Sequence, residues 1–139
     1  MAYPSIETSI WLALKARVQS LVLSPALPVA WPNESFNASL SSYLRVTWIP
    51  NINRRLFLSG SDPHQRLSRL QIDVFERKNQ NAAVAIEIAG QVAAHFPADL
   101  RMTAYGVTAR VTKAPEIAQP IPDDTHLLVP VTVSIEAII

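Results

Sequence analysis

The chain has 139 residues, of which 49% are hydrophobic and 17% are charged, and its formal net charge at pH 7 is +1. This is the length of an ordinary single domain, and the apolar content excludes an intrinsically disordered chain. The near-neutral charge gives no general attraction to nucleic acid or to an anionic membrane. Cysteine is absent, which excludes disulfides and thiolate chemistry. We therefore expect one globular domain over residues 1–139.

The first segment has apolar residues at helical spacing. They are Ile6, Ile10, Leu14, Val18 and Leu21. Glu7 lies in the first turn, where a carboxylate complements the helix dipole, so the pattern predicts a helix over residues 5–21. Lys15 and Arg17 interrupt the apolar run, so neither a signal peptide nor a membrane span is expected. This favours a cytoplasmic protein without membrane contact.

Extended segments follow the expected helix. Residues 29–31 are a short strand candidate, and residues 43–49 are rich in β-branched and aromatic side chains. The turn-rich stretch 50–66 predicts an exposed arm or long hairpin, with residues 56–58 as a candidate short strand. Apolar and polar residues alternate over residues 66–76, which predicts a central strand.

A second helical pattern opens the other half of the chain and ends at Pro97. Its apolar residues are Ala82, Ala85, Ile86, Ala89, Val92, Ala93 and Phe96. Residues 102–113 predict a strand pair around Tyr105 and Gly106. A proline-rich loop over residues 114–124 precedes a last strand over residues 126–138, in which Pro130 argues for an edge position or a bulge.

The order of helix, strands, helix and strands predicts an α+β fold, with a mostly antiparallel sheet and two helices packed on one face. The other face of this sheet is expected to be polar and aromatic. Its residues are Tyr43, Arg45, Gln71, Asp73, Phe75, Thr132 and Ser134. Such a face suits contact with a neighbouring subunit and equally suits water.

The residues that usually carry chemistry are scattered along the chain. His64, His95 and His126 have none of the short spacings of metal sites, and a partly protonated His95 would favour the helix end where it is expected. The glycines do not form a phosphate-binding loop. Asp62 and the Asp123–Asp124 pair stand in turns, where aspartate caps the backbone. The sequence therefore predicts no enzyme, no cofactor and no metal site.

Arginines concentrate only around the expected arm, at Arg54, Arg55, Arg66 and Arg69. Two interpretations stay open, a solvated loop or charged contacts that set the register with a partner, since arginine makes directional pairs with carboxylates. The second interpretation predicts a subunit or partner interface. Its candidate residues are Arg54, Arg55, His64, Arg66, Arg69, Asp73 and Phe75.

Several segments, in their order along the chain, carry a resemblance to a known family. They are residues 30–36, 43–46, 70–75, 94–97 and 129–133. Together they resemble small tail terminator proteins of long-tailed bacteriophages and prophages. The resemblance implies a structural virion protein that works as a homo-oligomeric, usually hexameric, ring in the virion tail, after assembly in the host cytoplasm. It brings no active site and no cofactor.

The resemblance also implies partners. Such a ring caps the tail tube protein and offers a surface to a head-completion or connector protein, while DNA passes through the ring lumen without specific recognition. Two other classes stay open at this point. One is a different connector or completion protein of the head–tail joint, and the other is a small enzyme or ligand-binding domain whose site is built from scattered residues.

Overall fold

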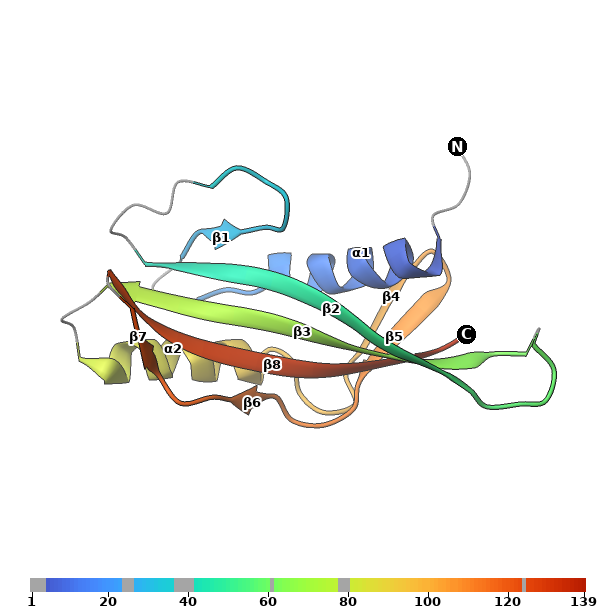
Figure 1. Ribbon diagram of the computed structural model, residues 1–139. Coiled ribbons are helices and arrows are strands. Elements are labelled where there is room, and N and C mark those ends of the chain that lie inside the picture. The colour runs from blue at the N-terminus through green and yellow to red at the C-terminus, as the bar shows by residue number, and fades with distance from the viewer. Residues whose placement is uncertain (1–4, 24–26, 37–41, 61, 78–80, 124) are drawn as a thin grey trace.

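The computed structural model describes residues 5–23, 27–36, 42–60, 62–77, 81–123 and 125–139. The described residues form an α+β structure, as expected, with two helices and an eight-stranded sheet (Figure 1). In chain order the elements are α1 (Ile6–Gln19), β1 (Val29–Ala30), β2 (Tyr43–Arg55), β3 (His64–Arg77), α2 (Ala82–Ala94), β4 (Arg101–Ala104), β5 (Val107–Val111), β6 (Glu116–Ile117), β7 (Ile121–Pro122) and β8 (His126–Ile138).

Helix α1 begins where a polar cap meets an apolar stripe. The Ser5 side chain accepts a hydrogen bond from the Thr8 backbone N–H at 3.2 Å, and Glu7 occupies the first turn. Leu14 of this helix is fully buried. The helix ends at Gln19, with Ser20 as its C-cap, and not at residue 21 as expected from the apolar spacing alone.

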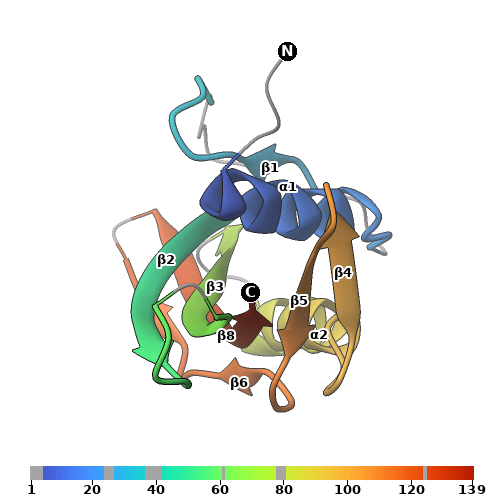
Figure 2. The same cartoon turned by 90° about the vertical axis from the view of Figure 1, so that its right-hand side faces the viewer.

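The strands form one curled sheet in the order β1-β2-β3-β8-β5-β4, and the short β6 and β7 also pair with β8. In the end-on view the sheet curves from β2 round to β4, and α1 lies across the open side (Figure 2). Strand β1 pairs with β2 in parallel, whereas the other described pairs are antiparallel. The sheet is therefore mixed, although mostly antiparallel.

The core is centred on β3 and β8. Alternate residues of the two strands face each other in register and are fully buried, namely Leu70 with Val133, Ile72 with Val131, and Val74 with Val129. This confirms the alternation expected over residues 66–76. Leu14 of α1 and Ala89 of α2 belong to the same buried cluster, so both helices contribute to one core.

Helix α2 presents a narrow apolar face to this core. Its buried residues are Ala85, Ile88, Ala89 and Val92. The inward position expected for Ile86 is wrong, because Ile86 is 47% exposed while Ile88 is 1% exposed. Steps of three and four residues from Ala85 reach the other buried positions, and Ile86 lies outside that stripe.

The edge position or bulge expected from Pro130 is also wrong. Strand β8 lies inside the sheet, with β3 along one side and β5, β6 and β7 along the other. The Pro130 carbonyl accepts a hydrogen bond from the Ala118 N–H at 2.9 Å, on the side of the short segments. Because the N and C=O groups of one residue in an antiparallel strand point to the same side, the missing Pro130 N–H costs no bond to β3.

The strand pair expected over residues 102–113 is confirmed as the β4–β5 hairpin. Tyr105 has φ 49° and Gly106 has φ 76°, which is typical of a two-residue hairpin turn. Val107, Ala109 and Val111 of β5 point into the core, as expected from their spacing.

Candidate functional site

The β2–β3 hairpin projects beyond the helices and the rest of the sheet (Figure 1). Its strands pair as far as Arg55 with His64, so the expected arm over residues 50–66 falls on the outer part of this hairpin. Residues 56–58, a candidate strand from the sequence, lie in the tip and not in a strand. We call Leu56, Phe57 and Leu58 the apolar tip; their exposed fractions are 45%, 53% and 97%. Clustered exposed apolar side chains make this tip a candidate interaction site.

Arg55 shapes the apolar tip from within the hairpin. Its Nε donates to the Phe57 carbonyl at 3.0 Å, and its Nη2 donates to the Leu58 carbonyl. Arg54 is exposed and pairs in register with Gln65 on β3. Of the two neighbouring arginines, Arg55 therefore supports the geometry of its own turn, and Arg54 lies beside the tip.

The end of the chain braces the hairpin. The backbones of His64 and Ile139 exchange two hydrogen bonds, at 3.1 Å and 3.0 Å, and the His64 ring Nε2 lies 3.2 Å from the Gly60 carbonyl oxygen. Ile138 is 55% exposed and pairs in register with Gln65. The hairpin is thus anchored by β8, and Ile138 extends the exposed apolar surface at its base.

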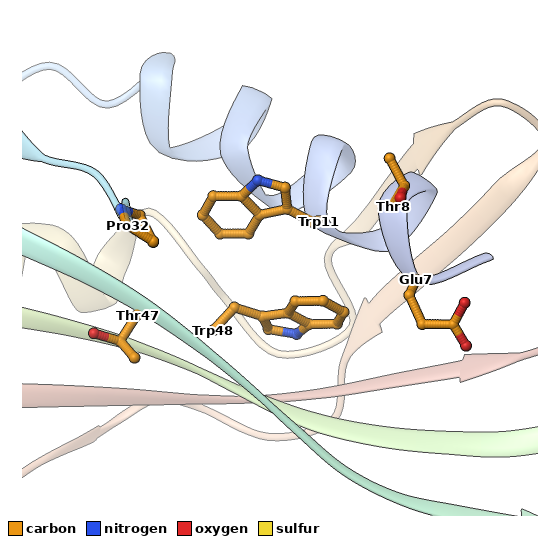
Figure 3. Close-up of a pocket in the computed structure, with 6 residues that line it drawn as sticks. All are labelled: Glu7, Thr8, Trp11, Pro32, Thr47 and Trp48. Carbon is orange, nitrogen blue, oxygen red and sulfur yellow. The ribbon is translucent and has the colours of Figure 1, made fainter. Parts of the chain in front are cut away.

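A second surface lies between α1 and β2, where all three tryptophans of the chain meet. The rings of Trp11 and Trp48 are stacked with centroids 6.3 Å apart, and Trp31 meets Trp11 edge-on at 6.2 Å. A pocket of about 320 Å³ opens here (Figure 3). We call it the tryptophan slot; its lining residues are Glu7, Thr8, Trp11, Pro32, Thr47 and Trp48.

Charged groups stand at the slot. Lys15 Nζ lies 5.1 Å from the centre of the Trp31 ring and 3.5 Å from the Glu34 carboxylate. Glu7 pairs with Arg66 Nη1 at 3.0 Å. Both carboxylate side chains remain more than half exposed, at 57% for Glu7 and 55% for Glu34. The slot is therefore an aromatic pocket flanked by two ion pairs whose carboxylates are partly exposed.

On the outer face of β2 and β3, neighbouring side chains are joined by hydrogen bonds and ring contacts. Arg45 Nη2 donates to Asp73 Oδ2 at 3.0 Å, and Gln71 Nε2 donates to Asp73 Oδ1 at 2.8 Å. The Arg45 guanidinium lies 4.9 Å from the centre of the Phe75 ring, which stacks on Tyr43 at 4.6 Å. Asp73 is only 1% exposed and Phe75 is 6% exposed. Although both were expected on a polar, accessible face, their own neighbours already cover them.

The candidate interface residues thus fall in separate places. Arg54, Arg55 and His64 lie on the outer hairpin, and Arg66 reaches back to Glu7 on α1. The remaining candidates are Arg69, which is exposed, and the buried pair Asp73 and Phe75. Their joint role in an interface stays a prediction, but the structure does not bring them into one site.

The histidines lie in separate surroundings. His95 Nε2 lies 2.9 Å from the Arg17 carbonyl oxygen and 2.9 Å from Ser20 Oγ, and burial lowers the pKa of His95. The expectation that His95 is partly protonated is therefore wrong, because burial disfavours the charged imidazole. His126 is buried, with its ring edge-on to both members of the stacked pair Tyr43 and Phe75. Among the described residues, no group of three or more His, Asp or Glu side chains could hold a metal ion.

Sequence reasoning missed the tryptophan slot. One signal was available, because Trp11 lies at the edge of the buried stripe of α1 and packs only partly against the core, so part of its indole is free to meet other aromatic partners. The partners Trp31 and Trp48 come from distant segments, so no spacing rule brings them together. No helix in the described part of the chain is long and apolar enough to cross a membrane.

Comparisons with known proteins bear on the fold and on the family. Six solved chains match, and one of them, known only by a sequence identifier, aligns with a TM-score of 0.70 and 24% identity over 91% of this chain and 94% of that chain. This likeness shows the fold alone. No curated protein matches the chain. A family model described as phage tail terminator protein matches residues 9–135, nearly the whole length, and the chain therefore belongs to the phage tail terminator protein family.

Proposed function

We propose that this protein caps the tail tube of a long-tailed bacteriophage or prophage, ends its polymerisation and offers a surface to head-completion proteins. The observation that carries the proposal is the apolar tip, which projects exposed from a chain of the tail terminator family. Apolar surface is stabilised when contact with a partner releases the water around it. The proposed role consists of binding and includes no chemical step.

The working form in this proposal is a closed homo-oligomeric ring, with six copies as the family resemblance implies. A ring repeats one head-to-tail contact, so each copy needs two different and complementary surfaces. The tube protein binds on one side of the ring and a head-completion or connector protein on the other. DNA passes through the lumen without specific recognition, and the ring assembles in the host cytoplasm before it becomes part of the virion tail.

The candidate interface residues take different parts in this proposal. Arg54 and Arg69, which are exposed, contact neighbouring chains. Arg55 and His64 hold the shape of the outer hairpin through their contacts with its tip. The buried residues Asp73 and Phe75 act indirectly, because they fix the position of Arg45, whose side chain is 52% exposed.

Polymerisation of the cognate tube protein, with and without this protein, tests the proposal. Electron microscopy should show tubes that stop growing and carry a cap at one end when the protein is present. The variant Leu58→Ser should fold normally and leave the tubes uncapped. Val22→Ser is a matched control, since Val22 is 89% exposed but follows α1 near the inner end of the hairpin, away from the apolar tip.

Two outcomes would count against this function. Tubes of equal length with and without the folded protein would contradict tail termination. Retained binding to the head-completion protein under those conditions would instead favour another connector role in the head–tail joint.

A further inference from the structure

Each subunit carries an apolar protrusion and an apolar recess at different places. Leu58 of the apolar tip is 97% exposed, so its side chain is not packed against the described part of its own chain, and Leu56 and Phe57 are about half exposed. The tryptophan slot is a recess of about 320 Å³ between α1 and β2 (Figure 3). Two complementary surfaces of this kind on one molecule can meet between copies. A head-to-tail contact closes into a ring or continues as a filament, whereas a reciprocal contact gives a two-fold dimer, and the proposed ring requires the head-to-tail form.

We propose that the apolar tip of one copy docks into the tryptophan slot of the next copy. This inference rests on the proposed ring and names the contact that closes it. The occupant of the slot is thus a second copy of this chain, and the docking side chains are Phe57 and Leu58.

The chemistry of the two surfaces matches. The slot is walled by Trp11, Trp48 and Pro32, so its largest surfaces are aromatic and aliphatic. A recess of this volume holds roughly ten water molecules at their share of liquid volume. Insertion of Phe57 and Leu58 displaces that water and places apolar side chains against indole faces, which is the arrangement found at the energetic centre of interfaces.

Partly exposed carboxylates beside the slot favour the same pairing. Arg54 is exposed beside the tip. On the slot side, Glu7 is a lining residue, and Glu34 forms an ion pair with Lys15, whose ammonium group lies over Trp31. Glu7 and Glu34 each make one ion pair in their own subunit, yet each carboxylate can accept several hydrogen bonds. An incoming arginine can therefore bind there without breaking the contacts already present.

The contact is small, which explains why ring closure matters. A few side chains bury much less than the roughly 1,000 Å² of a stable two-body interface. A closed ring or a tube end holds neighbouring copies at high effective concentration, so individually weak contacts act together.

The absence of native cysteine allows a direct test by designed disulfides. Gly60→Cys places a thiol in the hairpin turn, where an added Cβ meets no atom within 4 Å, and Thr8→Cys places one at the slot. The two single variants are purified separately, mixed on tube ends at high concentration and oxidised. Any Gly60→Cys to Thr8→Cys product is then a contact between copies. Lys113→Cys, whose native side chain is 58% exposed, replaces Thr8→Cys as the matched control.

Tryptophan emission gives a second readout, because every tryptophan of the chain belongs to the slot cluster. Docking should exclude water and shift the emission to shorter wavelength as the protein concentration rises. Leu58→Ser should weaken this concentration-dependent shift by roughly tenfold or more, as expected for loss of a central apolar anchor. Val22→Ser should leave the shift unchanged.

A cross-link of Gly60→Cys to Thr8→Cys well above the Lys113→Cys control, together with the emission shift, supports tip-to-slot docking. Rings or capped tubes that form without either signal overturn the docking and leave tail termination standing. Docking signals without any effect on tube length support the contact and overturn the proposed function. If the folded protein gives neither signal and no assembly on tubes, both are overturned.

Discussion

The two ends of the β2–β3 hairpin have similar apolar residues in opposite surroundings. At the inner end, Leu44 and Val74 pair in register and are 1% and 0% exposed, since both belong to the core cluster to which the two helices contribute. At the outer end, Phe57 and Leu58 are 53% and 97% exposed. One pair of strands thus places part of its apolar surface in the core and leaves another part accessible. Folding accounts for the first part, and we assign the second to assembly.

The largest expected effect is at the inner end. Ile72→Ala would leave a cavity opposite Val131 in a fully buried row and should lower the free energy of unfolding by roughly 2–5 kcal/mol. Phe57→Ala at the outer end is the matched change and should stay within about 0.5 kcal/mol of wild type. Urea denaturation followed by circular dichroism measures both free energies of unfolding. Similar losses of stability in the two variants would contradict the difference between the inner and outer ends of the hairpin.

The next effect concerns the covered outer face. Asp73→Ala would leave Arg45 and Gln71 without their shared acceptor and should cost roughly 1–3 kcal/mol of unfolding free energy. Thr47→Ala is the control, because Thr47 lies on the same face and is only partly buried, so its loss should cost less. A neutral Asp73→Ala variant in the same denaturation experiment would mean that this network does not stabilise the fold.

Two glycines give a smaller pair of effects with opposite signs. Gly106 has φ +76°, so Gly106→Ala forces a side chain into the left-handed region and should cost about 1–2 kcal/mol. Gly90 lies within α2, and an added Cβ there meets no atom within 4 Å, so Gly90→Ala should stabilise the protein by about 0.5–1 kcal/mol. Thermal unfolding of both variants checks the signs, and a loss of stability at Gly90 would contradict the packing described for α2.

The smallest effect is a pH dependence at the contact between the helices. Burial lowers the pKa of His95, so the unfolded chain binds a proton more readily than the folded one. Stability should therefore fall as the pH drops below the ordinary histidine pKa of about 6.5, and level off below the lowered pKa of the folded state. His95→Gln should flatten this part of the curve of unfolding free energy against pH; an identical slope in both proteins would exclude His95 as the source.

Much of the fold follows from local patterns. The alternation of Leu70, Ile72 and Val74 predicts the central strand, and the pair Tyr105–Gly106 predicts the β4–β5 turn, because both signals lie within a few residues. The burial of Ile86 and the edge position of Pro130 were predicted wrongly, because the environments of both residues depend on partners elsewhere in the chain. Helix α2 can use more than one apolar stripe, and the effect of a proline in β8 depends on which side its nitrogen faces.

The candidate surfaces were less predictable for the same reason. The turn-rich stretch and its arginines pointed to the outer hairpin, and Arg54 is exposed there as an interface residue would be. The division of labour between Arg54 and Arg55 could not be predicted, since it depends on the path of the turn back to the Phe57 carbonyl. The tryptophan slot requires α1, β1 and β2 to be in place, and no short motif encodes that meeting.

The most direct test of the central claim measures folding and tube capping on the same samples. Ile72→Ala, Leu58→Ser and Val22→Ser are compared by the fraction of tube ends capped per folded molecule, with folded protein determined by circular dichroism. The account predicts that Ile72→Ala loses folded protein but that its remaining folded molecules still cap, and that Leu58→Ser folds fully and fails to cap. Val22→Ser should resemble wild type. Normal capping by fully folded Leu58→Ser would contradict the assignment of the apolar tip to assembly.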